Sequence, residues 1–557
     1  MLPVISRLLS CLLPFPCLLL ISLAIFAVYR LYFHPLAQIP GPKLAALSSA
    51  WLGRYVVAGR VRELPRKIHE RYGPVVRVGP GEVWVSSVEG FRAVYGATSG
   101  FEKSDFYVAT ALNKPTGIKA WGLGVTWPDT LDLLSEFDMK RYRLQRRLIG
   151  PVYTASNVRK FEGAVDGVLD AAVKRLKSLS SEAGGTGTVD LKEWMHIIAV
   201  ECLGAVVLGW SPGYIKSGSD GGTSKQSYLG WKRKSLFGLF PVVTKISMLD
   251  SGMGKRLGKW LGRFWGDVWG VTFPTPKGFR PFFTPVYQKV SKRVAAVLST
   301  PQHAAGLTTV KGKKNKPNKT PGVREDLLND LIQLHLTRPD AFTENYLRRM
   351  AVTNFGAGHE TLCGTLTSVI AMIASYPEVQ RRCFEEINNS LQNGQKERLY
   401  GFEEVSKLRY TQAAIKEAQR LWPVIGMSLS RRTPAQGCTI GGYDIQGGTI
   451  VGCSPLALHA FNEDVFGKDG LEYKPERWLT DDIERLRVME RCNLIWGGGG
   501  RTCPGRYLAE MIVFKVITTL LGEFDVEVTK MPEEEEMECY FMAMMSGVVV
   551  RFRERPR

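Results

Sequence analysis

The sequence contains no Cys-x-x-Cys pair, no zinc-ribbon spacing and no internal repeat. Its ten cysteines are too few among 557 residues for a disulfide scaffold, and nine of them are expected to be buried free thiols in a reducing compartment. Acidic residues are in the minority, 53 against 73 basic ones, and the net charge of +20 favours contact with nucleic acid, anionic lipid or an acidic protein. Because 10% of the residues are aromatic, the chain is not a disordered basic tail protein.

The N-terminus carries a long apolar run without charge, residues 8–29. It is long enough to span a bilayer as a helix and ends at Tyr29, Arg30 and Tyr32, which suit a membrane interface. A cleaved signal peptide is the competing interpretation, but its apolar region is normally shorter and ends at small residues. Basic residues follow the run, so the positive-inside bias places the body in the cytosol. The domains predicted are a short lumenal segment 1–7, a transmembrane anchor 8–29, a basic and proline-rich hinge 30–43 and a main domain 44–557.

Patterning along the main domain predicts strands near both ends and helices between them. The expected elements are a hairpin in 75–87, a basic helix in 137–153 ended by Gly150 and Pro151, a long helix in 344–375, strands after 436, a helix in 500–524 and a strand at the tail. Residues 301–324 lack an apolar period and are expected to form a flexible basic loop. The fold class predicted is mainly α with small β-sheets (α+β), in a single large helical domain.

One cysteine, Cys503, lies in the glycine-rich stretch WGGGGRTCPG, residues 496–505. Small residues allow backbone amides to approach a thiolate, and a helix that starts just after the loop adds positive potential. A lone cysteine cannot make a zinc site, but it can be the single axial ligand of a haem. A buried loop thiol is an equally good interpretation of Cys503 alone.

A second stretch, FGAGHET at 355–361, lies inside the long apolar helix. Gly358 costs helix stability, and Thr361 can bond back to a carbonyl. Glu360 and Thr361 together place an acid and a hydroxyl in an apolar setting, where they could deliver protons. A helix kink without chemistry is the alternative. Two further stretches are EAQR, with Glu417 and Arg420 three residues apart, and KPERW, whose Arg477 could join that pair.

Taken together in this order, the four stretches resemble the cytochrome P-450 family of haem-thiolate monooxygenases. The family's F-x-x-G-x-R-x-C-x-G pattern is present with Trp496 in place of Phe, and its A-G-x-[D/E]-T pattern is intact at 357–361. Leu362 replaces the usual second threonine, so the proton path has one hydroxyl fewer. The E-x-x-R pair, a P-E-R-F element ending in Trp478, and a hinge at Pro40–Pro42 also match.

The resemblance implies a role for each matched residue. Cys503 would be the axial ligand of the iron of haem b, and Thr361 and Glu360 would handle oxygen and protons. Glu417, Arg420 and Arg477 would form a buried structural network. The residues expected to surround the haem or to bind its propionates are Tyr142, Arg146, Ala357, Arg431, Trp496, Gly499, Arg501 and Gly505. The substrate pocket is expected to include Phe106, Trp121, Phe355, Val424, Ile425 and Met427.

The resemblance also implies partners. The sequence has no flavin or nicotinamide domain, so electrons from NADPH would arrive through a separate cytochrome P-450 reductase docked on the basic helix. Residues 225–280 hold eleven basic and two acidic residues with four tryptophans, which suits a membrane interface, although an amphipathic helix pair with a solvated face is a fair alternative. The anchor and the haem loop argue against nucleic-acid binding. The chain is expected to be a monomer in the endoplasmic reticulum membrane.

The function predicted is oxidation, most simply hydroxylation, of a lipophilic small molecule. The sequence around 438–479 most resembles filamentous-fungal members of this family, which modify terpenoids, polyketides or alkaloids. Two alternatives remain: a haem-thiolate isomerase or dehydratase that needs no dioxygen, and a haem-bearing sensor without enzymatic activity. Neither the substrate nor the choice between hydroxylation, epoxidation, desaturation and coupling can be read from one chain.

Overall fold

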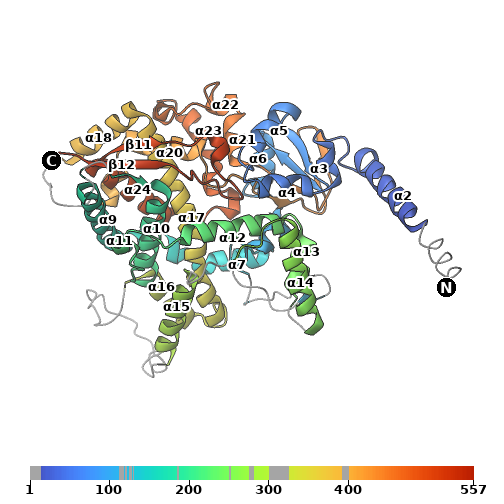
Figure 1. The fold of residues 1–557 in the computed structure, drawn as a ribbon, viewed down its shortest axis with the longest axis horizontal. Coiled ribbons are helices and arrows are strands. Elements are labelled where there is room, and N and C mark those ends of the chain that lie inside the picture. The colour runs from blue at the N-terminus through green and yellow to red at the C-terminus, as the bar shows by residue number, and fades with distance from the viewer. Residues whose placement is uncertain are drawn as a thin grey trace.

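A 32-residue helix, α17 (Glu344–Ser375), crosses the centre of the molecule (Figure 1). It begins where the Thr343 side chain accepts a hydrogen bond from the amide of Tyr346, and it ends just before Pro377. Most of its residues are buried because helices cover it on several sides. Those packed against it include α10 (Leu191–Leu208), α15 (Phe283–Leu298), α20 (Arg409–Leu421) and α24 (Arg506–Glu523).

The computed structural model describes residues 14–111, 118–119, 122–123, 128, 131–182, 184, 187–249, 252–274, 282–299, 325–391 and 400–556. The other α-helices in these ranges are α2 (Pro14–Val28), α3 (Lys43–Leu47), α4 (Ala50–Val57), α5 (Leu64–Tyr72), α6 (Val88–Tyr95), α7 (Met139–Ile149), α8 (Ala155–Val158), α9 (Glu162–Glu182), α11 (Tyr214–Ser217), α12 (Thr223–Gly238), α13 (Pro241–Ser247), α14 (Gly252–Val268), α16 (Leu327–Thr337), α18 (Pro377–Leu391), α19 (Phe402–Val405), α21 (Pro455–Ala460), α22 (Glu463–Phe466) and α23 (Ile483–Cys492).

The strands are short and form four small sheets. Their bounds are β1 (Val75–Gly79), β2 (Glu82–Val85), β3 (Glu102–Lys103), β4 (Ile118–Lys119), β5 (Gly122–Leu123), β6 (Val189–Asp190), β7 (Arg431–Arg432), β8 (Cys438–Ile440), β9 (Tyr443–Ile445), β10 (Ile450–Gly452), β11 (Phe524–Lys530) and β12 (Val549–Glu554). The largest sheet has the order β1-β2-β10-β7-β3, and a second has the order β11-β12-β6. The larger sheet joins distant parts of the chain, since β10 pairs parallel with β2, and β3 pairs antiparallel with β7.

One large apolar core runs from Leu52 to Phe552 and includes most of the buried face of α17. A smaller core lies under the five-stranded sheet and contains Val83, Val85 and Val451. The molecule is therefore mainly helical with small sheets, as the sequence predicted. The hairpin in 75–87, the basic helix that ends at Gly150, and the bounds of the long helix are confirmed. The predicted loop 301–324 lies outside the described residues.

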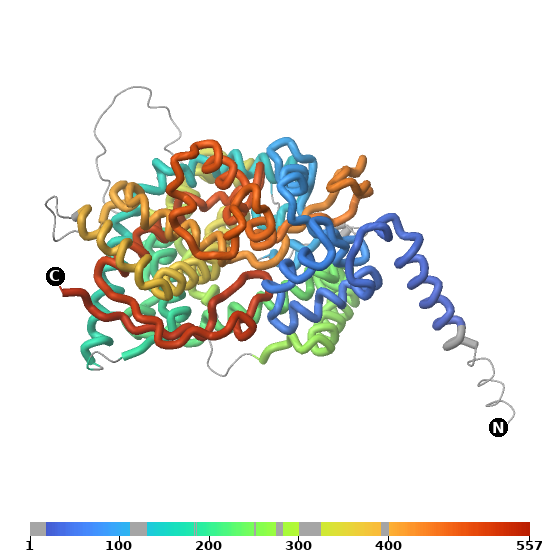
Figure 2. The backbone as a smooth tube through the Cα atoms, turned by 90° about the horizontal axis from the view of Figure 1, so that it is seen from above, coloured from blue at the N-terminus to red at the C-terminus, as the bar shows by residue number. Residues whose placement is uncertain are grey.

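The apolar N-terminal helix α2 projects from the body (Figures 1 and 2). It continues as a π-helical turn, Tyr29–Phe33, and exposes large apolar side chains such as Leu20 at 65% and Phe33 at 73%. Within the described ranges, no single helix is both long and apolar enough to cross a membrane, and the apolar helical stretch here is Leu18–Phe33. The first part of the predicted anchor, residues 8–13, is not among the described residues, and neither is segment 1–7.

Candidate active site

The Cys503 loop connects the 3-10 turn Leu494–Trp496 to α24. The loop is closed by a hydrogen bond of 2.8 Å from the Cys503 amide to the Trp496 carbonyl. Burial raises the pKa of the Cys503 thiol. The backbone amide of Gly505 and the charges of Arg146 and Arg506 act in the opposite direction and favour the thiolate. The residue as a whole keeps partial exposure.

The glycines before Cys503 are required by packing against α6. Gly499 has a φ of +56°, and a Cβ there would lie 2.3 Å from the Tyr95 carbonyl oxygen. A Cβ at Gly498 would lie 2.7 Å from the Tyr95 Cβ atom. The sequence predicted that the glycines let amides approach the sulfur. The Gly505 amide does favour the thiolate, whereas Gly498 and Gly499 bring the loop close to Tyr95.

The middle of α17 is open on one side. Ala357 is exposed and Thr361 is partly exposed, although their neighbours Phe355 and Leu362 are buried. The Thr361 hydroxyl donates back to the Ala357 carbonyl at 2.6 Å, as the sequence suggested, and the helix remains continuous. A Cβ at Gly358 would lie 3.0 Å from Leu203, so this glycine lets α17 and α10 pack closely.

Glu360 occupies different surroundings from its neighbour Thr361. Its carboxylate is fully buried, and neither oxygen has a hydrogen-bond partner among the described residues. Burial raises the pKa of this carboxyl group. The closest basic group is His359, whose Nε2 lies 3.5 Å from Glu360 Oε1. The acid and the hydroxyl that the sequence placed together are therefore split between the interior and the open side of α17.

Three cations gather near the Cys503 loop: the buried Lys103 and Arg431, and the half-buried Arg501. Lys103 and Arg431 are direct partners in the β3–β7 pair. The ammonium of Lys103 donates to the Leu134 carbonyl at 2.6 Å, and burial, with Arg501 and Arg431 nearby, holds its pKa well below the usual range. Burial also lowers the pKa of Arg501 to about 10. Among the described residues, none of the three forms an ion pair with a carboxylate.

Arg501 and Arg431 are held by carbonyl groups and aromatic rings. Arg501 donates to the Phe137 carbonyl at 2.9 Å, and its guanidinium lies 3.9 Å from the ring centroid of Tyr142. Arg431 donates to the Ser430 carbonyl at 3.0 Å. The ring of Tyr142 thus supports the guanidinium of Arg501. Arg146, one turn later on α7, is half-buried.

Comparison with known proteins decides the family. The cytochrome P-450 family model matches residues 40–547. The chain belongs to the cytochrome P-450 family. It is 54% identical to the cytochrome P-450 monooxygenase sdnT of Sordaria araneosa over 552 residues, which cover 97% of this chain and 95% of that protein. It is 28% identical to the cytochrome P-450 monooxygenase gsfF of Penicillium aethiopicum, over 95% of both chains. It is also 24% identical to a pisatin demethylase of Fusarium vanettenii, over 92% of this chain and 90% of that enzyme.

The protein is thus a cytochrome P-450 monooxygenase with a cysteine-ligated haem. The described residues fit that group in three respects. The Gly505 amide favours the thiolate of Cys503, and the exposed Ala357 and partly exposed Thr361 leave one side of the long helix open. Cations without acidic partners suit the two haem propionates, because a buried charge needs a partner of opposite sign. Lys103 was not predicted from the sequence, because its place beside Arg431 follows from the pairing of two strands that are distant in the chain.

The residues of the predicted P-450 structural network are brought together. Glu417 is fully buried and accepts from Arg420 at 2.7 and 2.8 Å, and from Arg477 at 3.0 Å. The indole N–H of Trp478 donates to the same carboxylate at 2.8 Å. Arg420 also donates to the Gly470 carbonyl at 2.6 Å. Each charge in this solvent-free cluster therefore has a partner.

Most of the predicted pocket residues lie beside one turn near the C-terminus. Phe106 stacks on Phe541 at 5.6 Å, and Ile425 pairs with Met542. The Met427 amide donates to the Phe541 carbonyl, and the Val424 carbonyl accepts from Ala543. The sequence analysis did not predict a role for the segment 540–545, although its run of apolar residues was visible in the sequence. Trp121 lies outside the described residues.

Phe355 does not fit the expected pocket. Its ring is fully buried and packs against Phe282 at 5.7 Å, next to α15. The side chain therefore points into the helix interface instead of toward the open side of α17. The wrong assignment came from position alone, since Phe355 precedes Ala357 by two residues and so faces another side of the helix.

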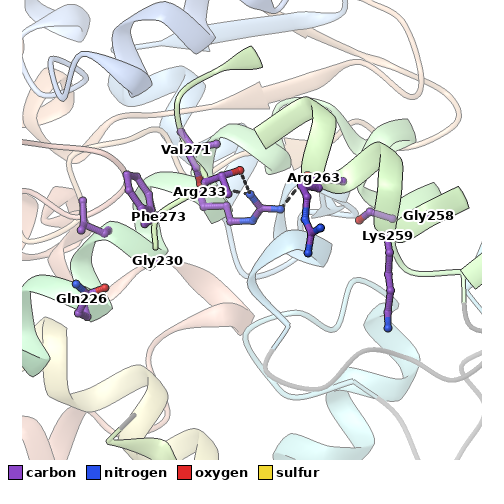
Figure 3. A pocket seen from close by; sticks show the side chains of 12 residues that line it. Gln226, Gly230, Arg233, Gly258, Lys259, Arg263, Val271 and Phe273 are labelled. Carbon is purple, nitrogen blue, oxygen red and sulfur yellow. Dashed lines mark hydrogen bonds between the residues drawn. The ribbon is translucent and has the colours of Figure 1, made fainter. Parts of the chain in front are cut away.

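A separate cavity of about 580 Å³ lies between α12 and α14 and is lined by none of the predicted site residues. Arg233 crosses it and donates to the carbonyls of Gly262 at 2.9 Å and Val271 at 3.3 Å (Figure 3). Lys259 and Arg263 also line it. None of these three cations has an ion pair within the described part of the chain. These three side chains make this side of the molecule basic.

Proposed function

We propose that the enzyme hydroxylates a lipophilic small molecule in a fungal secondary-metabolite pathway, with electrons from NADPH delivered by a separate reductase. The similarity to sdnT, gsfF and a pisatin demethylase supports a fungal tailoring role. Buried aromatic and aliphatic side chains around Phe541 support an apolar substrate of the terpenoid, polyketide or alkaloid class. Such a pocket excludes water and holds the substrate by its shape.

Cys503 is the proposed haem ligand, and Lys103, Arg431 and Arg501 are the proposed partners of the propionates. The single observation that carries this assignment is a group of three cations next to the loop of Cys503, two buried and one half-buried, without carboxylate partners among the described residues. Bound haem supplies the iron at which dioxygen is activated. The chain itself stabilises the thiolate through the Gly505 amide and balances the propionates with fixed cations.

Thr361 and Glu360 are the proposed residues for proton handling. The Thr361 hydroxyl lies on the open side of α17 with its proton directed to the Ala357 carbonyl oxygen. Glu360 lies one residue earlier, and its raised pKa keeps a proton available nearer to neutral pH. The carboxylate is buried away from the open side, so a change of its rotamer or an ordered water must link the two groups.

The proposed reductase site is the exposed face of α7. Lys140, Arg143 and Arg147 are exposed there and have no ion pair among the described residues. Arg141 contributes less, because Glu136 at 2.9 Å neutralises its charge. Positive charge beside the thiolate loop would steer an acidic flavoprotein toward the haem.

We further propose a single-pass anchor in the endoplasmic reticulum membrane, formed by the segment that includes α2, with the catalytic body in the cytosol. Support comes from α14, which displays Met253, Leu257, Trp260, Phe264 and Val268 on one face. Lysines and arginines flank this stripe, and Trp269, just after α14, lies against Gly53 of α4. In both overall views α14 and α2 lie toward the same end of the body, so both can meet one membrane (Figures 1 and 2).

The proposal is tested first by the spectrum of the reduced protein with carbon monoxide. Full-length protein should show the strongly red-shifted Soret band of thiolate-ligated haem, and the Cys503→Ser variant should lose it. Turnover is then screened with reductase, NADPH and labelled dioxygen over a panel of lipophilic metabolites. Incorporation of one labelled oxygen atom supports the assignment. A red-shifted band retained in Cys503→Ser, or product formed without NADPH, would contradict it.

A further inference from the structure

A cluster of metal-binding side chains lies in the core between α10 and α17. His196, His359 and Glu360 each offer one nitrogen or oxygen, and these three atoms lie within 4.8 Å of one another. The exposed fractions of the three residues are 0%, 2% and 0%. Polar groups buried this deeply require partners, because a buried donor or acceptor without one loses the hydrogen bonds that water would have supplied.

The imidazole of His196 is oriented by a carboxylate. Its Nδ1 lies 2.8 Å from Oδ2 of Asp220. Asp220 in turn accepts the amides of Gly222 at 2.8 Å and Ser224 at 2.9 Å, which hold it in place as a carboxylate. Neither ring nitrogen of His196 makes a hydrogen bond of good geometry among the described residues, so Nδ1 rests beside Asp220 and Nε2 is left for a ligand. A carboxylate beside one ring nitrogen is the usual companion of a metal-ligating histidine.

His359 is prepared in the same way by a different acceptor. Its Nδ1 lies 2.6 Å from the Phe355 carbonyl, so Nδ1 carries the proton and Nε2 carries the lone pair. Nε2 lies 2.8 Å from the Ser227 hydroxyl and 3.5 Å from Glu360 Oε1. Two ligand atoms bound at about 2.1 Å in a tetrahedron are about 3.4 Å apart, which matches the second distance.

Glu360 supplies the remaining donor. Both of its oxygens lack hydrogen-bond partners among the described residues. The nearby lysines of α10 and α12 do not form ion pairs with it: Lys192 rests 4.7 Å over the ring of Tyr228, and Lys234 rests 5.0 Å over that of Trp231. A bound cation would satisfy the carboxylate and the free nitrogen of His196 together.

We propose that His196, His359 and Glu360 bind one zinc ion, with Asp220 and the Phe355 carbonyl orienting the two imidazoles. Two imidazoles and one carboxylate are a recurrent zinc ligand set, whereas magnesium and calcium prefer oxygen ligands. The fourth position falls to the Ser227 hydroxyl or to a water held by it. The two positive charges of the ion balance the carboxylates of Glu360 and Asp220.

Zinc content measures the site directly. Haem-loaded, full-length protein is treated with a chelator, dialysed against Zn²⁺ at equilibrium, and assayed for zinc and haem by mass spectrometry. We expect one tightly bound zinc per haem in the wild type and none in His196→Gln. Asp220→Asn should weaken binding by about 10–100-fold, as expected for loss of an orienting carboxylate. The control is His335→Gln, since His335 bonds the Phe342 carbonyl away from the cluster and its loss should change nothing.

Zinc K-edge absorption of the wild type guards against variants that fail to fold. It should show imidazole ligands at about 2.0–2.1 Å in four-coordinate geometry. Equal zinc binding by wild type and His196→Gln, or a spectrum without imidazole, would overturn the proposal. The carbon monoxide spectrum reports the haem independently, so a missing zinc site and a wrong haem ligand give separate results.

Discussion

The contribution of a charged residue to stability depends on whether its charge is exposed to water. Glu417 is enclosed, and Arg420, Arg477 and Trp478 all donate to its two oxygens. Glu490 carries the same charge but pairs at the surface with Lys416, where their side chains are 52% and 38% exposed. Removing the Glu417 charge leaves the buried Arg420 without a carboxylate partner, although Arg477 keeps Asp469, whereas water replaces the partner in the second pair.

Glu417→Gln should therefore destabilise the fold strongly while changing its shape little. We expect a loss of about 3–5 kcal/mol in the free energy of unfolding, because the buried Arg420 loses its counter-charge, while Arg477 keeps its pair with Asp469. Denaturant unfolding followed by tryptophan fluorescence measures it. The control, Glu490→Gln, should cost less than about 1 kcal/mol. Similar losses in the two variants would show that the buried network is not special.

At the scale of a residue, burial of His459 makes the stability of the fold depend on pH. It is buried, with Nδ1 3.0 Å from the Arg420 carbonyl and Nε2 accepting the Leu494 amide at 3.1 Å. Burial lowers its pKa from 6.5 to about 3, so the folded state holds the neutral ring. The unfolded chain takes up the proton first. Stability is therefore intact above about pH 6.5 and falls by about 1.4 kcal/mol per pH unit below it.

The measurement is the free energy of unfolding of the wild type and His459→Gln between about pH 7 and pH 5. The variant should be less stable at neutral pH, yet it should lose less stability per pH unit than the wild type. His69 and His359, whose pKa values burial lowers to about 4 and about 3, add to the acid sensitivity of both proteins. Identical slopes for the two proteins would contradict the assignment.

At the scale of elements, α14 separates its two faces sharply. Gly258, Gly262 and Gly266 form the buried face, where a Cβ at Gly258 would lie 2.4 Å from the Ile246 carbonyl oxygen. The opposite face exposes Trp260 at 62% and Val268 at 60%. Glycines thus let α14 lie close to α13 and turn its large apolar side chains outward, the arrangement expected of a helix at a bilayer surface.

Trp260 should therefore contact acyl chains. In vesicles that carry brominated lipid, the fluorescence of the full-length protein should be quenched, and Trp260→Phe should remove part of the quenching. Trp84→Phe is the matched control, because Trp84 is fully buried and its replacement should leave the quenching unchanged. If both variants lose quenching equally, α14 does not enter the membrane.

For the whole molecule, the effect of the net charge of +20 on binding depends on where the basic residues lie on the surface. Exposed basic residues on α7 form the proposed docking face for the reductase, and charges elsewhere contribute little at physiological salt because of screening. Arg143→Glu should slow reduction by the reductase about 3- to 10-fold at low salt, and added salt should reduce that difference. Stopped-flow reduction under carbon monoxide measures the rate. Lys530→Glu, on β11, is the control and should be nearly neutral.

The sequence predicted the helical class, the main elements and the network of Glu417, because periodicity and motif order are local properties. It did not identify Lys103, since the pairing of β3 with β7 joins residues 328 positions apart in the chain, a tertiary contact that no local pattern encodes. It misplaced Phe355 and joined Glu360 to Thr361, because adjacency in the chain does not say which side of a helix faces a cavity. The proposed zinc cluster was invisible for the same reason, as His196 belongs to another helix.

The β3–β7 pair has a consequence for assembly. Its two strands carry Lys103 and Arg431 as direct neighbours, so like charges face each other where the sheet edge must close. Bound propionates would remove that repulsion. Haem uptake would then be a late folding step that seals this edge, and the unloaded chain should exchange its β3 amide hydrogens faster than the loaded one. Cofactor supply in the cell would thereby decide which newly made chains survive quality control.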